Sequence, residues 1–145
     1  MMGYLKKPMG LDRRLDHILD RNHHLFKLAN EIDWGYFVKE FGEFFVERTG
    51  QAGKPIRLLV GLYYLKQAYN ESDESCLDLF LENPYWQFFC GFEYFQYEYP
   101  LKPESLVMWR KKIGREGIEK LVYQIFGTAQ KFGLLKGKQS SVRNV

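Results

Sequence analysis

Apolar residues recur at helical spacing through much of the chain, and this pattern predicts an all-α fold. In residues 34–45 they stand three or four positions apart, so they would share one face of a helix that begins after Asp33 and ends near Arg48. These residues are Trp34, Phe37, Val38, Phe41 and Phe45. Residues 56–69 are apolar almost all round, which is typical of a central, buried helix.

Polar residues suited to helix N-termini divide the neighbouring stretches into shorter helices. Asn22 is expected to cap a helix over residues 23–31. Ser72 or Asp73 is expected to cap another that runs to Leu81.

A third short helix is predicted over residues 85–90. Asn83 and Pro84 end the helix before it and start this one, and Gly91 closes it. Residues 92–99 follow with partial alternation and are predicted to be a loop or a short extended segment. Their rings are Phe92, Tyr94, Phe95, Tyr97 and Tyr99.

Two further helices are predicted after residue 100. One covers residues 103–113 with Lys102 at its N-cap position, and Gly114 breaks it. The other covers residues 115–132 and is closed by Gly133. Its expected apolar face consists of Ile118, Leu121, Val122, Ile125 and Phe126.

Together these elements predict a compact bundle of six or seven short helices with a helix-turn-helix-like segment and a basic C-terminal tail. Residues 1–21 lack a clear period and are expected to form a flexible lead-in. Residues 22–133 would form the helical domain, and residues 134–145 the tail. Short connections make consecutive helices neighbours in space.

Charge is distributed unevenly along the 145 residues. The net charge is only +3, but residues 71–98 contain seven Asp/Glu and no Lys/Arg. Residues 99–145 contain ten Lys/Arg and three Asp/Glu. A basic last third beside an acidic middle favours a surface that faces nucleic acid. An ordinary solvated face with a basic tail fits the charges about equally well.

Several function classes find no support in the sequence. There is no apolar run long enough to span a membrane, and the first residues lack the apolar core of a secretory signal. Cys76 and Cys90 stand apart from any Cys/His cluster, so we expect a reducing, cytoplasmic setting and no bound metal. The acidic residues from 71 to 78 are interpreted as helix-start residues rather than as metal ligands.

The helix predicted over residues 103–113 is the best candidate for DNA contact. Its buried side would carry Leu106, Trp109 and Ile113. A short helix with an apolar back and a small, basic front fits a major groove. The candidate DNA-binding residues are Ser105, Met108, Lys111 and Lys112 on the front, with Arg110, Arg115, Lys136, Lys138 and Arg143 on phosphates. The acidic helix that precedes it argues against a tight two-helix motif, and a plain amphipathic helix explains the pattern about as well.

Five stretches, taken in order, resemble the N-terminal domain of bacterial insertion-sequence transposases of the insertion-sequence-five type. They are residues 31–34 (EIDW), 53–55 (GKP), 72–74 (SDE), 83–91 (NPYWQFFCG) and 100–114 (PLKPESLVMWRKKIG). The resemblance covers about residues 20–135. It implies a domain that binds double-stranded DNA at terminal inverted repeats and helps to pair transposase subunits in the bacterial cytoplasm, at the nucleoid.

The same resemblance implies that the catalytic carboxylates are absent from this chain. In such proteins a DDE domain with an RNase-H-like fold follows, and three carboxylates hold Mg²⁺ there. Its first Asp lies in a strand shortly after a segment like residues 136–145. We therefore expect a catalytically inert fragment, with Mg²⁺ needed only by the missing domain.

A second hypothesis is a protein-interaction module. The aromatic segment and the acidic middle of the chain would then mediate self-association or contact with a full-length transposase. Such a fragment would inhibit transposition by forming mixed assemblies.

Overall fold

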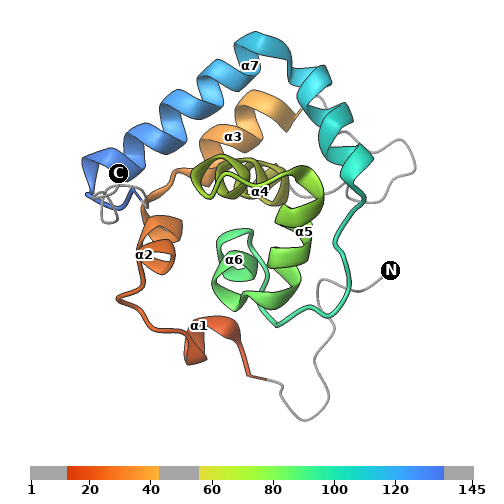
Figure 1. Cartoon of the computed structure of the whole chain (residues 1–145). Coiled ribbons are helices and arrows are strands. Elements are labelled where there is room, and N and C mark those ends of the chain that lie inside the picture. Colours follow the sequence, from red (N-terminus) through yellow and green to blue (C-terminus); the bar gives the residue numbers. More distant parts are fainter. Residues whose placement is uncertain (1–12, 43–55, 136–145) are drawn as a thin grey trace.

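The computed structural model describes residues 13–42 and 56–135, and within them it contains seven helices and no strand. The predicted all-α class is confirmed (Figure 1). The helices are α1 Leu15–Ile18, α2 His24–Glu31, α3 Trp34–Phe41, α4 Ile56–Ala68, α5 Asp73–Glu82, α6 Pro84–Phe89 and α7 Pro103–Lys131. The predicted helix end near Arg48 lies outside the described residues.

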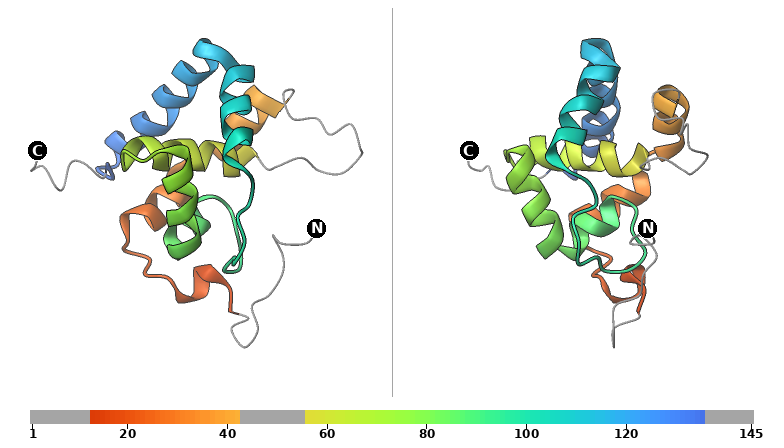
Figure 2. Two further views of the ribbon diagram at one scale, coloured as in Figure 1. Left: turned by 45° about the vertical axis from the view of Figure 1, so that its right-hand side comes forward. Right: turned by 90° about the vertical axis from the view of Figure 1, so that its right-hand side faces the viewer.

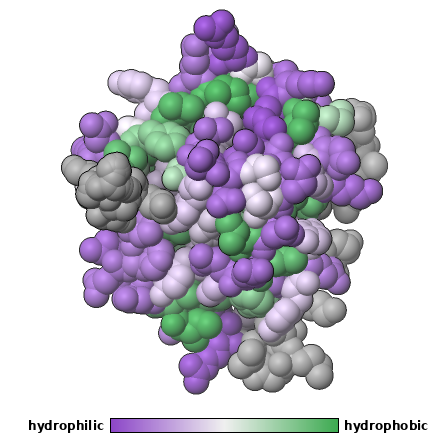
Figure 3. All heavy atoms as spheres, in the orientation of Figure 1, coloured by the Kyte–Doolittle hydropathy of each residue, from purple (hydrophilic) through white to green (hydrophobic). Residues whose placement is uncertain are grey.

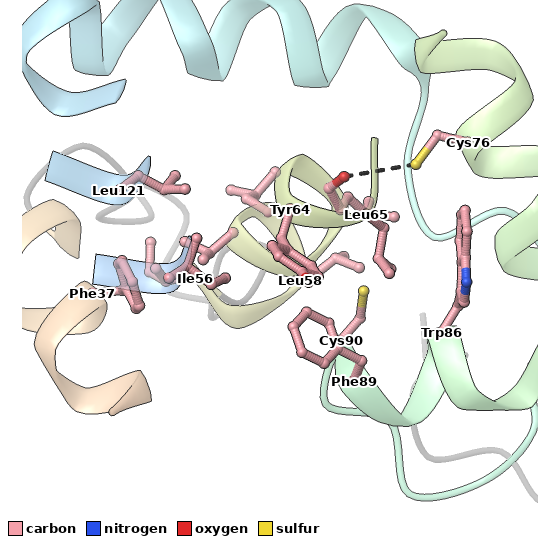
Figure 4. Close-up of a cluster of buried hydrophobic side chains, with 14 of the residues drawn as sticks. Phe37, Ile56, Leu58, Tyr64, Leu65, Cys76, Trp86, Phe89, Cys90 and Leu121 are labelled. Carbon is pink, nitrogen blue, oxygen red and sulfur yellow. Dashed lines mark hydrogen bonds between the residues drawn. The ribbon is translucent and has the colours of Figure 1, made fainter. Parts of the chain in front are cut away.

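Helix α4 occupies the centre, and α3, α5 and α7 pack against it (Figure 1). Eight of its thirteen residues are buried, on every side of the helix, which confirms the prediction of a central helix. Gly61 lets the C-terminal end of α6 approach closely, because a Cβ at this position would lie 2.9 Å from the Cys90 Sγ. Figure 4 shows α4 surrounded by buried side chains from α3, α6 and α7.

Aromatic rings fill most of the space around α4. Tyr64 packs on Phe126 of α7 with ring centroids 4.8 Å apart and on Phe89 of α6 at 5.4 Å. Large rings bury much apolar surface, so few contacts are needed to join short helices. The largest fully buried rings are Trp86, Trp109, Tyr64, Phe37, Phe41, Phe80 and Phe89.

Side-chain caps begin four of the helices. The cap at Asp33 was predicted, and of the two candidates Ser72 and Asp73 the structure uses Ser72. Asp33 accepts from the Tyr36 N–H, Ser72 forms a capping box with Ser75, and Asn83 accepts from the first amides of α6. Helix α2 differs, because its cap is His23 rather than Asn22: the His23 side chain accepts from the Leu25 N–H. Imidazole is an unusual cap, and a tertiary contact places it.

That contact is a stack of rings between α2 and α6. The His23 ring lies 3.7 Å from the Tyr85 ring and nearly parallel to it, with an interplanar angle of 12°. The Tyr85 hydroxyl also accepts from the backbone N–H of Asp20. Burial lowers the pKa of His23, so the neutral form, which can accept at the cap, is favoured.

Part of the expected flexible lead-in is ordered against the body of the protein. Residues 15–18 form α1, whose Leu15 is buried. The Leu15 N–H donates to the carbonyl of Glu93, 2.8 Å away. One helical turn is too short to show a hydrophobic period, so the pattern alone could not reveal it.

The aromatic segment after Gly91 is neither helix nor strand in the structure, and buried amides hold it. Gln87 on α6 accepts from the Gln96 N–H at 2.6 Å and donates to the carbonyls of Phe80 and Gln96. Both glutamines are buried. These bonds replace a backbone ladder, which explains how an irregular segment can be buried.

Helix α7 is two helices joined at an elbow, which confirms the break predicted at Gly114. This glycine has φ 70° and ψ −178°, a conformation that favours glycine. We call residues 103–113 the first limb and residues 115–131 the second limb; Figure 2 shows them meeting at a sharp angle over α4. The predicted closure at Gly133, with φ 67°, is also confirmed.

The buried face of the second limb is narrower than predicted. Its buried residues repeat every four positions and are Gly117, Leu121, Ile125 and Ala129. Val122 was expected on this face but is exposed, because only one row of the limb contacts α4 and its neighbours. Ile118 and Phe126 are half-buried beside that row.

Two glycines of the second limb should respond oppositely to alanine. A Cβ at Gly117 would lie 2.7 Å from the Ile113 Cβ, so Gly117→Ala should destabilise the fold by about 1–3 kcal/mol. No atom lies within 4 Å of a Cβ at Gly127, so Gly127→Ala should stabilise it by about 0.5–1 kcal/mol. Urea unfolding of both variants measures this, and equal effects would contradict the packing described.

Removing the buried amide of Gln87 should be costly. Gln87→Leu removes the hydrogen bonds to the Gln96 N–H and to the carbonyls of Phe80 and Gln96, and we expect a loss of about 3 kcal/mol or more. Gln67→Leu, at an exposed position near the C-terminus of α4, is the matched control and should change stability by less than about 0.5 kcal/mol. Comparable losses in the two variants would mean that these bonds do not hold the segment.

Candidate nucleic-acid interface

The first limb has the two faces that the sequence predicts. Leu106, Trp109 and Ile113 are buried, and the Trp109 ring meets Phe41 of α3 edge-on at 6.2 Å. The four front residues are exposed, namely Ser105, Met108, Lys111 and Lys112. The limb therefore presents a small, basic front to solvent while its back holds it on the core.

Arg110 is not placed as the sequence analysis expected. Its guanidinium donates two parallel hydrogen bonds to the Asp73 carboxylate, at 3.0 and 2.8 Å. The side chains are only 24% and 14% exposed, so this pair is shielded from solvent. A bidentate pair of this kind fixes geometry as well as charge. Arg110 thus joins the first limb to the first turn of α5 instead of standing ready for a phosphate.

The remaining predicted phosphate contacts lie at the elbow and beyond the described residues. The Arg115 side chain is 92% exposed and pairs with Glu119 one turn later, at 3.4 Å. An exposed pair of this kind contributes little to stability and exchanges readily for another partner. Lys136, Lys138 and Arg143 fall outside the described residues.

An acidic helix lies beside the basic front. Helix α5 contacts α7, and Glu74, Asp78 and Glu82, four residues apart, are all exposed on it. Helix α6 and the aromatic segment separate α5 from the first limb in the sequence, so the two are packed neighbours and not a tight helix-turn-helix. DNA on the first limb would therefore have to approach from the side away from α5.

Asp73 is the residue of this region whose role the sequence did not reveal. It appeared there only as an acidic residue in the first turn of a helix, where the macrodipole explains it. Its partner lies 37 positions away. No local pattern relates the two, and only the packing of α5 on the first limb brings them together.

Other chemistry finds no site among the described residues. Burial raises the pKa of the Cys76 thiol to about 12, so this cysteine is not a reactive thiolate. In residues 13–42 and 56–135, no group of three or more His, Cys, Asp or Glu could hold a metal ion. No helix in these ranges is both long and apolar enough to cross a membrane.

Comparison with known proteins connects the chain with transposition. Residues 13–112 match the family described as "Transposase domain (DUF772)". The chain is also 45% identical over 109 residues to "Uncharacterized protein ORF8 in nfe locus" of Rhizobium meliloti. That match covers 75% of this chain and 52% of the relative, so the chain spans about half the relative's length. No solved structure matches the chain. The family match includes the whole front of the first limb and ends at Lys112.

Breaking the shielded ion pair should loosen the first limb. Asp73→Asn leaves the Arg110 guanidinium half-buried without its carboxylate, and we expect a loss of about 1–3 kcal/mol in urea unfolding. Glu119→Gln breaks the exposed pair with Arg115 and serves as the control, with an effect below about 0.5 kcal/mol. A small effect of Asp73→Asn would show that burial of Trp109 and its neighbours alone places the limb.

Proposed function

This chain belongs to the transposase domain family (DUF772), and from that premise we propose that it binds the terminal inverted repeats of an insertion sequence. The observation that carries the proposal is the first limb: a helix with a buried back and an exposed front of small and basic residues. A major groove is wide enough to admit such a helix. The resemblance to the N-terminal domain of insertion-sequence-five transposases supports the same role.

In this proposal the front of the first limb reads the groove. Ser105 and Met108 lie nearer its N-terminus, where a short side chain and a flexible apolar one suit base edges. Lys111 and Lys112 lie one turn later and reach phosphates. Arg115, at the elbow, becomes available when DNA competes with Glu119. Arg110 acts indirectly, by holding the limb against α5.

We further propose that the chain itself does not cut or join DNA. In the transposases that the chain resembles, catalysis belongs to a separate domain whose three carboxylates hold Mg²⁺. The described residues would then supply recognition of the transposon ends.

A second candidate function, self-association, is favoured by the surface of the second limb. Val122, Tyr123 and Phe132 are exposed there, Tyr123 to 79%. Figure 3 shows apolar residues gathered along the part of this face where the second limb of α7 runs. A shallow hollow of about 530 Å³ follows the limb and is open to solvent. Grouped apolar side chains on a surface are typical of contact sites.

The first test of DNA binding is fluorescence anisotropy over a salt series. The Lys111→Ala/Lys112→Ala variant should lower the slope of log affinity against log salt by about 2, because each lost phosphate contact removes about 0.9. Lys27→Ala/Lys39→Ala, which removes two exposed lysines of α2 and α3, is the matched control and should keep the slope. An unchanged slope in the first variant would remove the first limb from the interface.

End recognition requires a comparison of duplexes. The inverted repeat of the element that encodes the chain should bind roughly 10³-fold or more tightly than a scrambled duplex of equal length. Equal affinities for the two duplexes would mean that the protein binds DNA only through a nonspecific basic surface.

Self-association is tested by sedimentation equilibrium. If the second limb mediates it, Tyr123→Glu should shift the protein from dimer to monomer, whereas Met108→Glu on the first limb should not. A concentration-independent monomer in the unmodified chain would exclude this function.

A further inference from the structure

A pocket of about 240 Å³ is lined by residues of α1, α2, α4 and α6 and of the segment that follows α6. Figure 1 shows α1, α2 and α6 together at the end of the molecule away from the elbow of α7. It is smaller than the roughly 300–1,000 Å³ of sites for drug-sized ligands, so it suits a single chemical group. The lining includes Arg14, Asp16, Asn30, Arg57, Gly91 and Glu93.

Arg57 contributes to this pocket a guanidinium group whose hydrogen bonds go to backbone carbonyls and not to a carboxylate. Its Nε donates to the Phe89 carbonyl at 3.0 Å and its Nη2 to the Phe88 carbonyl at 3.1 Å. The guanidinium also lies over the Trp34 ring, 4.4 Å from its centroid. Within the described residues no carboxylate pairs with it. Burial lowers its pKa, a sign that the charge is poorly solvated.

The two acidic residues of the pocket are already engaged by another arginine. Arg14 donates to the carboxylates of Asp16 and Glu93, both at 3.1 Å. A third guanidinium, that of Arg21, donates to the Asp16 carbonyl at 3.1 Å. Arg14 therefore occupies both carboxylates of the pocket, and Arg57 is paired with neither of them.

The backbone at Gly91 lies so close to Arg57 that a side chain has little room there. Gly91 has φ 100°, and a Cβ there would lie 3.0 Å from the Arg57 Cδ. Any side chain at this position would push the arginine aside. On this side of the pocket, the Arg57 side chain therefore borders the backbone of Gly91 and no side chain.

We propose that this pocket binds a small oxyanion, a phosphate or carboxylate group, through Arg57 with Asn30 as a neutral donor. The two carbonyls occupy Nε and Nη2, and Nη1 is left for the ligand. Charge-assisted bonds from a guanidinium to an oxyanion are strong and directional. The ligand supplies the anionic partner that Arg57 lacks among the described residues. The inference is independent of the DNA-binding proposal, whose residues lie on the first limb.

The test is a titration with inorganic phosphate, followed by NMR. The Arg57 Nε–H, the Trp34 indole N–H and the Gly91 N–H report on the pocket directly. Sodium chloride at matched ionic strength is the reference. Saturable shifts of these signals with phosphate, and not with chloride, are expected.

Two variants link the shifts to the pocket. Arg57→Met should weaken phosphate binding by about tenfold or more, and Asn30→Ala, at an exposed position, by about threefold to tenfold. Lys39→Met, at an exposed position of α3, is the matched control and should leave binding unchanged. If Arg57→Met does not fold, the comparison of Asn30→Ala with Lys39→Met tests the proposal instead. Equal binding by all variants, or shifts reproduced by chloride, would overturn the proposal.

A further arm identifies the source of the oxyanion. A short duplex that moves the same signals and competes with phosphate would identify a DNA backbone phosphate. A duplex that leaves them unmoved while phosphate binds would identify a free anion. No shift with either ligand would refute the oxyanion site, while DNA binding through the first limb could still stand.

Discussion

The constraint on which the structure depends is the burial of α4. A helix that is apolar on every side cannot rest on a surface; it has to be enclosed, and burying its side chains supplies much of the favourable free energy of folding. The short helices α3, α5 and α6 and both limbs of α7 are arranged to enclose it. Few of them would be stable alone, since helices this short gain most of their stability from packing.

Enclosing α4 determines where the candidate interface lies. A single straight helix could cover only one side of α4, and the elbow at Gly114 lets α7 cover it in two directions. The second limb is closely packed through a row of small and branched residues. The first limb is buried only on its back, and its front remains exposed. The surface proposed to contact DNA is thus a consequence of how the core is closed.

Two half-buried arginines show two ways of placing a cation in this fold. Arg110 has a carboxylate partner in Asp73, and the pair links two helices. Arg57 has carbonyls at the C-terminus of α6 and an indole ring, which offset part of the cost of its burial but not its charge. The first arrangement is complete within the chain. In the second arrangement, Arg57 is the residue that we propose to bind a ligand. Arg110, by contrast, has a structural role.

The sequence by itself determined the helical class, the central position of α4, the cap at Asp33, the helix starts near Ser72 and Asn83, and the break at Gly114. All of these follow from local periods and from backbone preferences, which act over a few residues. Tertiary structure alone decided the cap at His23, the burial of α1, the amide bonds of Gln87 and the pairing of Arg110 with Asp73. Each of these depends on contacts between different elements of the fold. Such contacts leave no local pattern, because their free energy depends on which surfaces the packed core brings together.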